Sequence, residues 1–148
     1  MYHSFNPHRI EYYIGGFELF KTLSQTGLEG ERVLDIKNLA LRVAQAAWDV
    51  RAHDIKILDM RSVSIMTDYF VIVSGDSMVH VRAVVGAILD EVKDDDLKIK
   101  RREGSDDARW VLIDLGDVIA HVFHHAEREF YDLDNLWSDA GEIPWENT

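Results

Sequence analysis

The chain has 148 residues, no cysteine and a formal net charge of −11 at pH 7. Its length and its 47% apolar residues allow one sizeable core, so we expect one domain, and the absence of cysteine excludes structural disulfides and thiolate catalysis. The acidic balance opposes binding to a phosphate backbone and instead favours a basic protein partner.

The sequence carries no visible membrane or secretory signal. The longest apolar runs span only a few residues, and no cationic segment followed by an apolar stretch opens the chain. We therefore expect a cytoplasmic protein without a membrane partner. Residues 1–33 are rich in aromatic residues and glycines but sustain no apolar period, so we interpret them as an N-terminal extension, native or introduced by cloning, that is partly disordered.

The first elements after residue 33 are a helix followed by two strands. Asp35 is a plausible N-cap, and apolar residues recur at helical spacing from Ile36 to Val50. Residues 54–59 alternate in character and predict a strand, and residues 69–73 form a continuously apolar run typical of a central strand. The sheet therefore begins in this part of the chain.

A second helix is predicted directly after the turn Ser74-Gly75-Asp76-Ser77, with Ser77 as the N-cap. Its expected buried stripe consists of Val81, Val84, Val85, Ile88 and Val92. A strand, a Ser/Gly turn and a helix N-terminus can hold an anion through exposed amide groups. This turn lacks the G-x-G-x-x-G spacing and the Walker lysine, so we prefer a plain strand-to-helix connection to a phosphate site.

The only dense basic run in the sequence is residues 98–102, which lies between the acidic clusters 94–96 and 106–107. A short mixed-charge segment is more typical of a solvated edge strand or loop than of a nucleic-acid contact. We predict a short edge strand at residues 97–100, a turn at Glu103-Gly104, and little or no direct contact with nucleic acid.

Residues 109–137 hold the most informative pattern in the sequence. Two apolar runs, 110–115 and 118–123, flank Gly116-Asp117, a dipeptide that tolerates the positive φ of a two-residue hairpin turn. In the predicted register, one face of the hairpin is wholly aliphatic and should be core. Its pairs are Leu115 with Val118, Ile113 with Ala120, and Val111 with Val122.

The opposite face of the hairpin is mixed in its chemistry. Its pairs are Trp110 with Phe123, Leu112 with His121, and Asp114 with Ile119. We call it the mixed face; either helices cover it or it is offered to a partner, and the sequence alone leaves both possibilities open.

Apolar residues after the hairpin fall at spacings of four, three and four, which predicts one amphipathic helix that packs back on the sheet. These residues are Ala126, Phe130, Leu133 and Trp137. The helix should end near Trp137. Residues 139–148 then form a C-terminal tail, in which Ile143 and Trp145 can pack locally.

The residues that could carry chemistry are the histidines and carboxylates of the hairpin region. On a strand, His121 and His125 point to one side and His124 to the other, which does not fit a metal-ligand set. Asp114 and Asp117 are separated by the turn and lack the Asp-x-Asp pattern of two-metal phosphoryl chemistry. No nucleophile lies in a recognisable elbow. We therefore predict no catalytic residue, no essential metal and no cofactor.

An ordered set of motifs runs from residue 54 to residue 137. It comprises residues 54–59, DYFVIVSGDS at 68–77 followed by His80-Val81, Glu103-Gly104, residues 110–114 with Gly116-Asp117, His121-Val122-Phe123, and residues 128–133 through Leu136-Trp137. Together these motifs resemble the ribosomal silencing factor family, RsfS, also called Iojap. The resemblance covers roughly residues 35–138 and is specific as an ordered set, although each motif alone is weak. Asp134 departs from the glutamate that is usual in the family, and residues 1–33 lie outside the resemblance.

The resemblance implies a small α/β domain over residues 34–138, with a mixed β-sheet flanked by helices, similar to a minimal nucleotidyltransferase fold. It also implies a function: members bind large-subunit ribosomal protein fourteen on the subunit-joining face, keep the two ribosomal subunits apart and so repress translation when nutrients are scarce. A basic ribosomal protein would attract an acidic chain, which agrees with the net charge. The oligomeric state stays open, and a homodimer is one option.

The mixed face supplies the candidate partner-binding residues. Trp110 lies in the family's tryptophan position and has Phe123 opposite, so it has the features of a binding anchor. We expect Trp110, Phe123 and Tyr131 to supply apolar anchoring. We expect Asp114 and Glu127 to meet basic side chains at the rim. The competing interpretation of Trp110 is a core residue buried under a neighbouring helix.

A second class of function also stays open. The fold relation and the turn at residues 74–77 would suit a nucleotidyltransferase-like or phosphate-binding enzyme. The absence of an Asp-x-Asp pair near that turn weighs against this alternative.

Overall fold

The computed structural model describes residues 29–95, 101–104 and 107–147. The elements in chain order are α2 (Glu29–Asp49), β1 (His53–Asp59), β2 (Tyr69–Gly75), α3 (Met78–Val92), β3 (Arg101–Glu103), β4 (Trp110–Asp114), β5 (Val118–His124), α4 (His125–Tyr131), α5 (Leu133–Leu136) and β6 (Gly141–Ile143). None of the helices in these ranges is both long enough and apolar enough to span a membrane.

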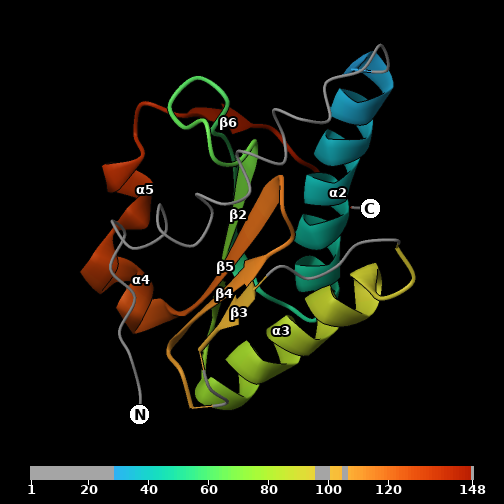
Figure 1. The fold of residues 1–148 in the computed structure, drawn as a ribbon. Coiled ribbons are helices and arrows are strands. Elements are labelled where there is room, and N and C mark those ends of the chain that lie inside the picture. Colours follow the sequence, from blue (N-terminus) through green and yellow to red (C-terminus); the bar gives the residue numbers. More distant parts are fainter. Residues whose placement is uncertain (1–28, 96–100, 105–106, 148) are drawn as a thin grey trace.

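Six strands of the described chain form one mixed sheet, in the order β3-β4-β5-β2-β1-β6. β2 and β5 run parallel, and the other neighbouring pairs run antiparallel. Helices α2 and α3 cover one face of the sheet, and α4 and α5 lie on the other (Figure 1). The protein is therefore a single α/β domain with a mixed sheet flanked by helices, as the resemblance implied.

The middle of the sheet is the most apolar part of the sequence. β2 is buried along its whole length, because it lies between β5 and β1 and carries helices on both faces. This confirms the prediction of a central strand at residues 69–73. The strand predicted at residues 54–59 is also confirmed as β1, which begins one residue earlier at His53.

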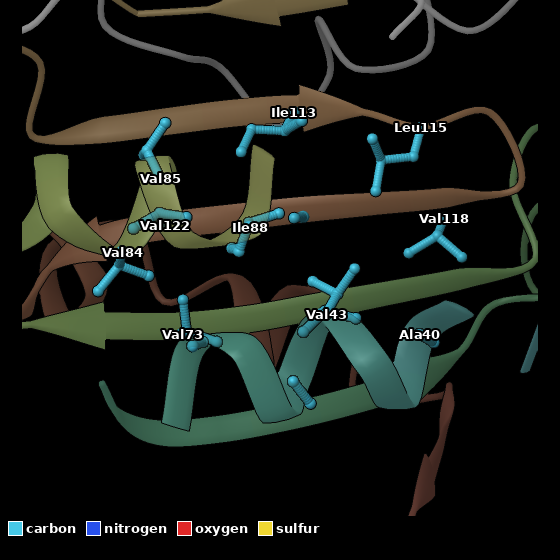
Figure 2. Close-up of a cluster of buried hydrophobic side chains, with 14 of the residues drawn as sticks. Ala40, Val43, Val73, Val84, Val85, Ile88, Ile113, Leu115, Val118 and Val122 are labelled. Atoms are coloured by element: carbon cyan, nitrogen blue, oxygen red, sulfur yellow. The ribbon is translucent and has the colours of Figure 1, made fainter. Parts of the chain in front are cut away.

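The β4–β5 hairpin has the register that its sequence predicts. Trp110 pairs with Phe123, and Ile113 pairs with Ala120. Gly116 takes a φ of 96°, a left-handed value that glycine adopts without steric cost at the first turn position. All six residues of the aliphatic face are buried in the core beneath α2 and α3, where Ile113, Leu115, Val118 and Val122 face Val43 of α2 and Val84, Val85 and Ile88 of α3 (Figure 2).

Helix α3 also follows its prediction. The Ser77 hydroxyl accepts a hydrogen bond from the backbone N–H of His80, which caps the helix. The five residues predicted for the buried stripe are the five that the structure buries. The agreement is close because the helical period runs without interruption from the cap to Val92.

The start of α2 differs from its prediction. α2 begins at Glu29, so Asp35 lies inside the helix and is not its N-cap. No proline separates residues 29–34 from the periodic part, and the single Gly30 costs only about 1 kcal/mol, so the helix continues backwards. The edge strand predicted at residues 97–100 and most of the extension, residues 1–28, lie outside the described residues. β3, which pairs with β4, is one edge strand of the described sheet, and β6 is the other.

The predicted C-terminal tail is part of the sheet. β6 pairs with β1 in antiparallel register, with Ile143 opposite Ile57. Ile143 and Trp145 pack against the core on the α2 side, and the Trp145 indole donates a hydrogen bond to the carbonyl of Ile55 at 3.4 Å. The boundary placed at residue 138 therefore cuts through the domain, because strand pairing with a distant partner leaves little periodic trace in a three-residue strand.

Candidate docking surface

The mixed face of the hairpin lies beneath α4, α5 and the loop between β1 and β2. Trp110, Asp114 and Phe123 are 1%, 1% and 0% exposed. Trp110 and Phe123 belong to a second buried apolar cluster that includes Leu133 of α5. The structure thus contradicts the expectation that these three side chains are offered to a partner, and it supports the competing interpretation of Trp110 as a core residue.

Ring packing and turn closure explain why these groups are buried. The Trp110 ring lies 4.6 Å from the Phe123 ring and 4.8 Å from the Tyr131 ring, measured between centroids. Such contacts remove a large aromatic area from water. The Asp114 carboxylate accepts a hydrogen bond of 2.8 Å from the Gly116 N–H, so it closes the hairpin turn instead of facing solvent.

Two histidines of this region, His121 and His124, have structural roles. His121 is fully buried, and burial, assisted by the nearby charge of Arg128, lowers its pKa to about 3. His124 caps α4 by accepting a hydrogen bond from the Ala126 N–H. The described residues contain no group of three His, Cys, Asp or Glu side chains that could hold a metal ion.

The helix predicted after the hairpin is in fact two short helices with a break at Asp132. This residue takes a left-handed conformation (φ 48°), and its N–H donates to the carbonyl of Arg128 at 2.9 Å, which ends α4. α5 then starts at Leu133. The break changes the phase of the helical period between the two halves.

The predicted apolar stripe is therefore split between two directions. Leu133 is fully buried and Trp137 half-buried, as expected, but Ala126 is exposed and Phe130 is 79% exposed. The prediction that all four pack on the sheet is wrong for Ala126 and Phe130. A helical spacing keeps residues on one face only while the backbone stays helical.

The consequence is an exposed patch that we call the α4–α5 surface. Its members are Glu127, Glu129, Phe130, Tyr131, Asp132 and Leu136. Phe130 and Leu136 are both exposed, the latter at 47%, and the Phe130 ring meets the half-buried Tyr131 ring edge-on at 5.1 Å. A single exposed apolar side chain is ordinary, but two large ones on adjoining short helices, bordered by carboxylates, have the composition of a protein-binding patch.

The charge of the α4–α5 surface is acidic. Glu129 and Asp132 are exposed, and Glu127 forms a 3.7 Å ion pair with Arg109. Two of the five side chains that the sequence nominated for partner binding, Glu127 and Tyr131, lie here and are half-buried. Their contact with a partner stays a prediction.

Comparison with known proteins identifies the family of the chain. The family model described as "Ribosomal silencing factor during starvation" matches residues 33–148. The chain belongs to this family. The ribosomal silencing factor RsfS of Bacillus subtilis is 48% identical over 101 residues, which are 68% of this chain and 86% of that protein.

Two further similar proteins extend the comparison. A crystal structure from Bacillus halodurans has a TM-score of 0.65 and 37% sequence identity, and the match covers 73% of this chain and 98% of that one. The mouse protein named mitochondrial assembly of ribosomal large subunit protein 1 is 34% identical over 93 residues, which are 59% of this chain and 40% of that protein. Membership gives the chain a ribosome-silencing role, which is regulatory in kind. The family match also continues through β6 to residue 148, beyond the boundary expected at residue 138.

Sequence reasoning missed the two exposed apolar side chains of the α4–α5 surface, Phe130 and Leu136. Leu136 carried no usable signal, because it lies three residues after Leu133, a helical spacing that assigns both to one face. Phe130 carried none, because its spacing from Ala126 and Leu133 assigns it to the buried stripe unless the break at Asp132 is known.

Proposed function

We propose that this silencing factor binds large-subunit ribosomal protein fourteen through the α4–α5 surface and thereby blocks association of the ribosomal subunits. The observation that carries the proposal is Phe130, an aromatic side chain that is 79% exposed within an acidic border. Aromatic residues at the centre of a patch supply most of the binding energy in protein interfaces.

Charge supports a ribosomal partner. Ribosomal proteins are typically basic, whereas this chain carries a net charge of −11. Exposed Glu129 and Asp132 would speed the encounter and orient it, and Phe130 and Leu136 would then be buried at the centre. The printed name of the mouse relative links that protein to the large ribosomal subunit, which makes this subunit the first partner to test.

The proposed mechanism is steric. A folded domain held on the subunit-joining face of the large subunit occupies space that the small subunit needs, so no bond is made or broken and no cofactor takes part. Silencing then depends on occupancy and hence on affinity. The action would take place in the cytoplasm, where the subunits join.

The direct test measures binding to purified large ribosomal subunits of Bacillus subtilis and, separately, to the isolated ribosomal protein. We expect Phe130→Ala to weaken binding about thirtyfold, on the order of 2 kcal/mol, mainly through faster dissociation. Leu136→Ala should weaken it less, because less of its area is free to be buried.

The matched control is Val79→Ala, which removes an apolar side chain that is 66% exposed on α3, over the opposite face of the sheet. It should bind like the parent protein. In a light-scattering assay of subunit joining, the parent and Val79→Ala should inhibit equally, and Phe130→Ala should need proportionally more protein. Equal affinity of Phe130→Ala and the parent would show that the α4–α5 surface is not the docking site.

A further inference from the structure

Among the lysines and arginines whose side-chain burial the structure describes, only Arg128 is buried. Its Nη1 donates to the backbone carbonyl of Asp54 and to the Ser74 hydroxyl at 2.9 Å. Its Nε and Nη2 donate to the two carboxylate oxygens of Asp134 at 3.2 and 3.0 Å. One guanidinium therefore ties α4 to α5 and to the strands β1 and β2.

The sheet is locally reshaped where Arg128 meets it. The register between β1 and β2 shifts between His53 and Lys56, which is a β-bulge, and Asp54 takes a left-handed φ of 50°. A bulged residue is released from the strand ladder, so the Asp54 carbonyl is available to accept from Arg128. Backbone strain of this kind is maintained only where surrounding contacts hold it.

On α5, the partner of the Arg128 guanidinium is Asp134. Asp134 receives both forks of the guanidinium and lies 3.3 Å from the Lys56 ammonium. Burial raises the pKa of the Asp134 carboxyl, but the hydrogen bonds and charges of Arg128 and Lys56 outweigh burial and hold the pKa below its usual range. The carboxylate is therefore charged at neutral pH, and the pair keeps its two-point geometry.

Neither helix of the docking surface is long enough to be stable alone. α4 has seven residues and α5 has four, whereas isolated helices shorter than about 12–15 residues are marginal in water. Their orientation must come from tertiary contacts. Leu133 anchors α5 through apolar packing, which is non-directional, and the forked Arg128–Asp134 pair supplies a contact with fixed direction.

We propose that Arg128 and Asp134 are positioning residues, whose ion pair holds α4 and α5 at the angle that presents Phe130 and Leu136 to the ribosomal partner. The inference rests on the docking surface proposed above. Arg128 and Phe130 lie on α4, and Asp134 and Leu136 lie on α5. A spacing of two residues turns each exposed side chain away from the ion-paired residue of its own helix, so the pair fixes the buried side while Phe130 and Leu136 point outward. The surface is thus ordered before the partner arrives, which lowers the entropic cost of binding.

The test compares Asp134→Asn with Asp134→Glu and with Lys56→Met, using purified large ribosomal subunits of Bacillus subtilis as the probe. Asp134→Asn keeps the shape but removes the charge, and it should weaken binding about tenfold. It should also speed amide hydrogen exchange in α4 and α5. The exchange rates in α3 should stay at the parental values, and unfolding should stay cooperative. Asp134→Glu restores the carboxylate and should stay within about threefold of the parent. Lys56→Met removes only the outer, half-exposed charge and should bind like the parent.

A purely structural role gives a different result. If Asp134→Asn changes stability but not affinity or local exchange in the folded protein, the positioning proposal is overturned. A second measurement needs no variant: in the parent protein the α4 and α5 amides should already be protected before large subunits are added. Protection that appears only on binding would overturn the proposal even if Asp134→Asn failed to fold. Phe130→Ala separates the two proposals. If Phe130→Ala binds with parental affinity, the docking surface is refuted. If Phe130→Ala binds more weakly but Asp134→Asn binds with parental affinity, only the positioning role of the Arg128–Asp134 pair is refuted.

Discussion

The indole Nε1 of Trp110 donates a hydrogen bond of 3.1 Å to Nδ1 of His121, and both rings are buried between the sheet and the α4–α5 layer. Because Nδ1 accepts, the proton of the neutral imidazole lies on Nε2. The Nε2 atom has no hydrogen-bond partner in the described chain. The two residues thus form a polar contact inside an aromatic cluster. We therefore expect substitutions of either residue to change the free energy of unfolding first, and affinity for a partner only as a consequence.

We predict that Trp110→Ala lowers the free energy of unfolding by about 3–5 kcal/mol, because it removes a buried indole and leaves a cavity beside Phe123 and Tyr131. It also leaves the His121 Nδ1 without its donor. Against a total stability of roughly 5–15 kcal/mol, this loss is large. Urea denaturation followed by circular dichroism measures it.

Phe130→Ala is the control for Trp110→Ala, because it also removes a large aromatic group but from an exposed site. Its unfolding free energy should stay within about 0.5 kcal/mol of the parent. Should Trp110→Ala keep the parental denaturation midpoint and lose only affinity, Trp110 would be a surface anchor after all.

Acid should destabilise the protein through His121. Its pKa is about 3 in the folded protein and about 6.5 when unfolded, so the unfolded chain binds the extra proton between these values. Stability is therefore complete above about pH 6.5 and falls as the pH drops towards 3. Between pH 6.5 and 4.5 the parent should lose about 2 kcal/mol through this group.

The comparison for this pH effect is His121→Asn, which can still accept from the Trp110 indole but does not titrate. Its unfolding free energy should change less with pH over the same window. The lowered pKa values of the Asp59 and Asp134 carboxyl groups also stabilise the folded protein. This stabilisation is lost mainly below about pH 4, as the unfolded chain becomes protonated before the folded protein does. Parallel pH profiles for the parent and His121→Asn would mean that protonation of His121 is not opposed by the core.

Ile113→Asp should abolish cooperative folding. Ile113 is fully buried on the aliphatic hairpin face, directly under α3, and an uncompensated carboxylate there costs several kcal/mol (Figure 2). Ile113→Val is the matched control and should cost only about 0.5–1.5 kcal/mol. A cooperative melt of Ile113→Asp near the parental temperature would contradict the placement of this face in the core.

The features that the sequence predicts well are those whose causes are local. The hairpin register follows from the alternation on either side of Gly116-Asp117, and the α3 stripe follows from an unbroken period that starts at the Ser77 cap. Both patterns are complete within a short stretch of chain. A period-two or period-3.6 pattern needs no knowledge of the rest of the fold.

The features that the sequence predicts poorly have distant causes. Whether Trp110 faces solvent depends on α5 and the β1–β2 loop, which cover it only in the folded protein. The break at Asp132 lets the Asp134 carboxylate pair with the Arg128 guanidinium. The same guanidinium also donates to the backbone carbonyl of Asp54, which is far away in the sequence. Tertiary contacts of this kind override local periodicity, and so the exposed position of Phe130 could not be predicted.

The final prediction concerns β6, the edge strand formed by what looks like a tail. Deleting residues 141–148 removes the pairing with β1, the packing of Ile143 on the core and the edge-on contact between Trp145 and Trp48 at 6.1 Å. We expect a loss of about 2–4 kcal/mol, since the burial of two half-buried apolar side chains no longer stabilises the folded domain. The uncovered edge of β1 should also promote self-association.

The control deletes only residues 146–148, which keeps β6 and Trp145. This variant should unfold at the parental urea midpoint. By light scattering it should be as monodisperse as the parent. If the two deletions unfold at the same midpoint as the full chain, β6 contributes nothing to the domain, and the boundary at residue 138 was the better one.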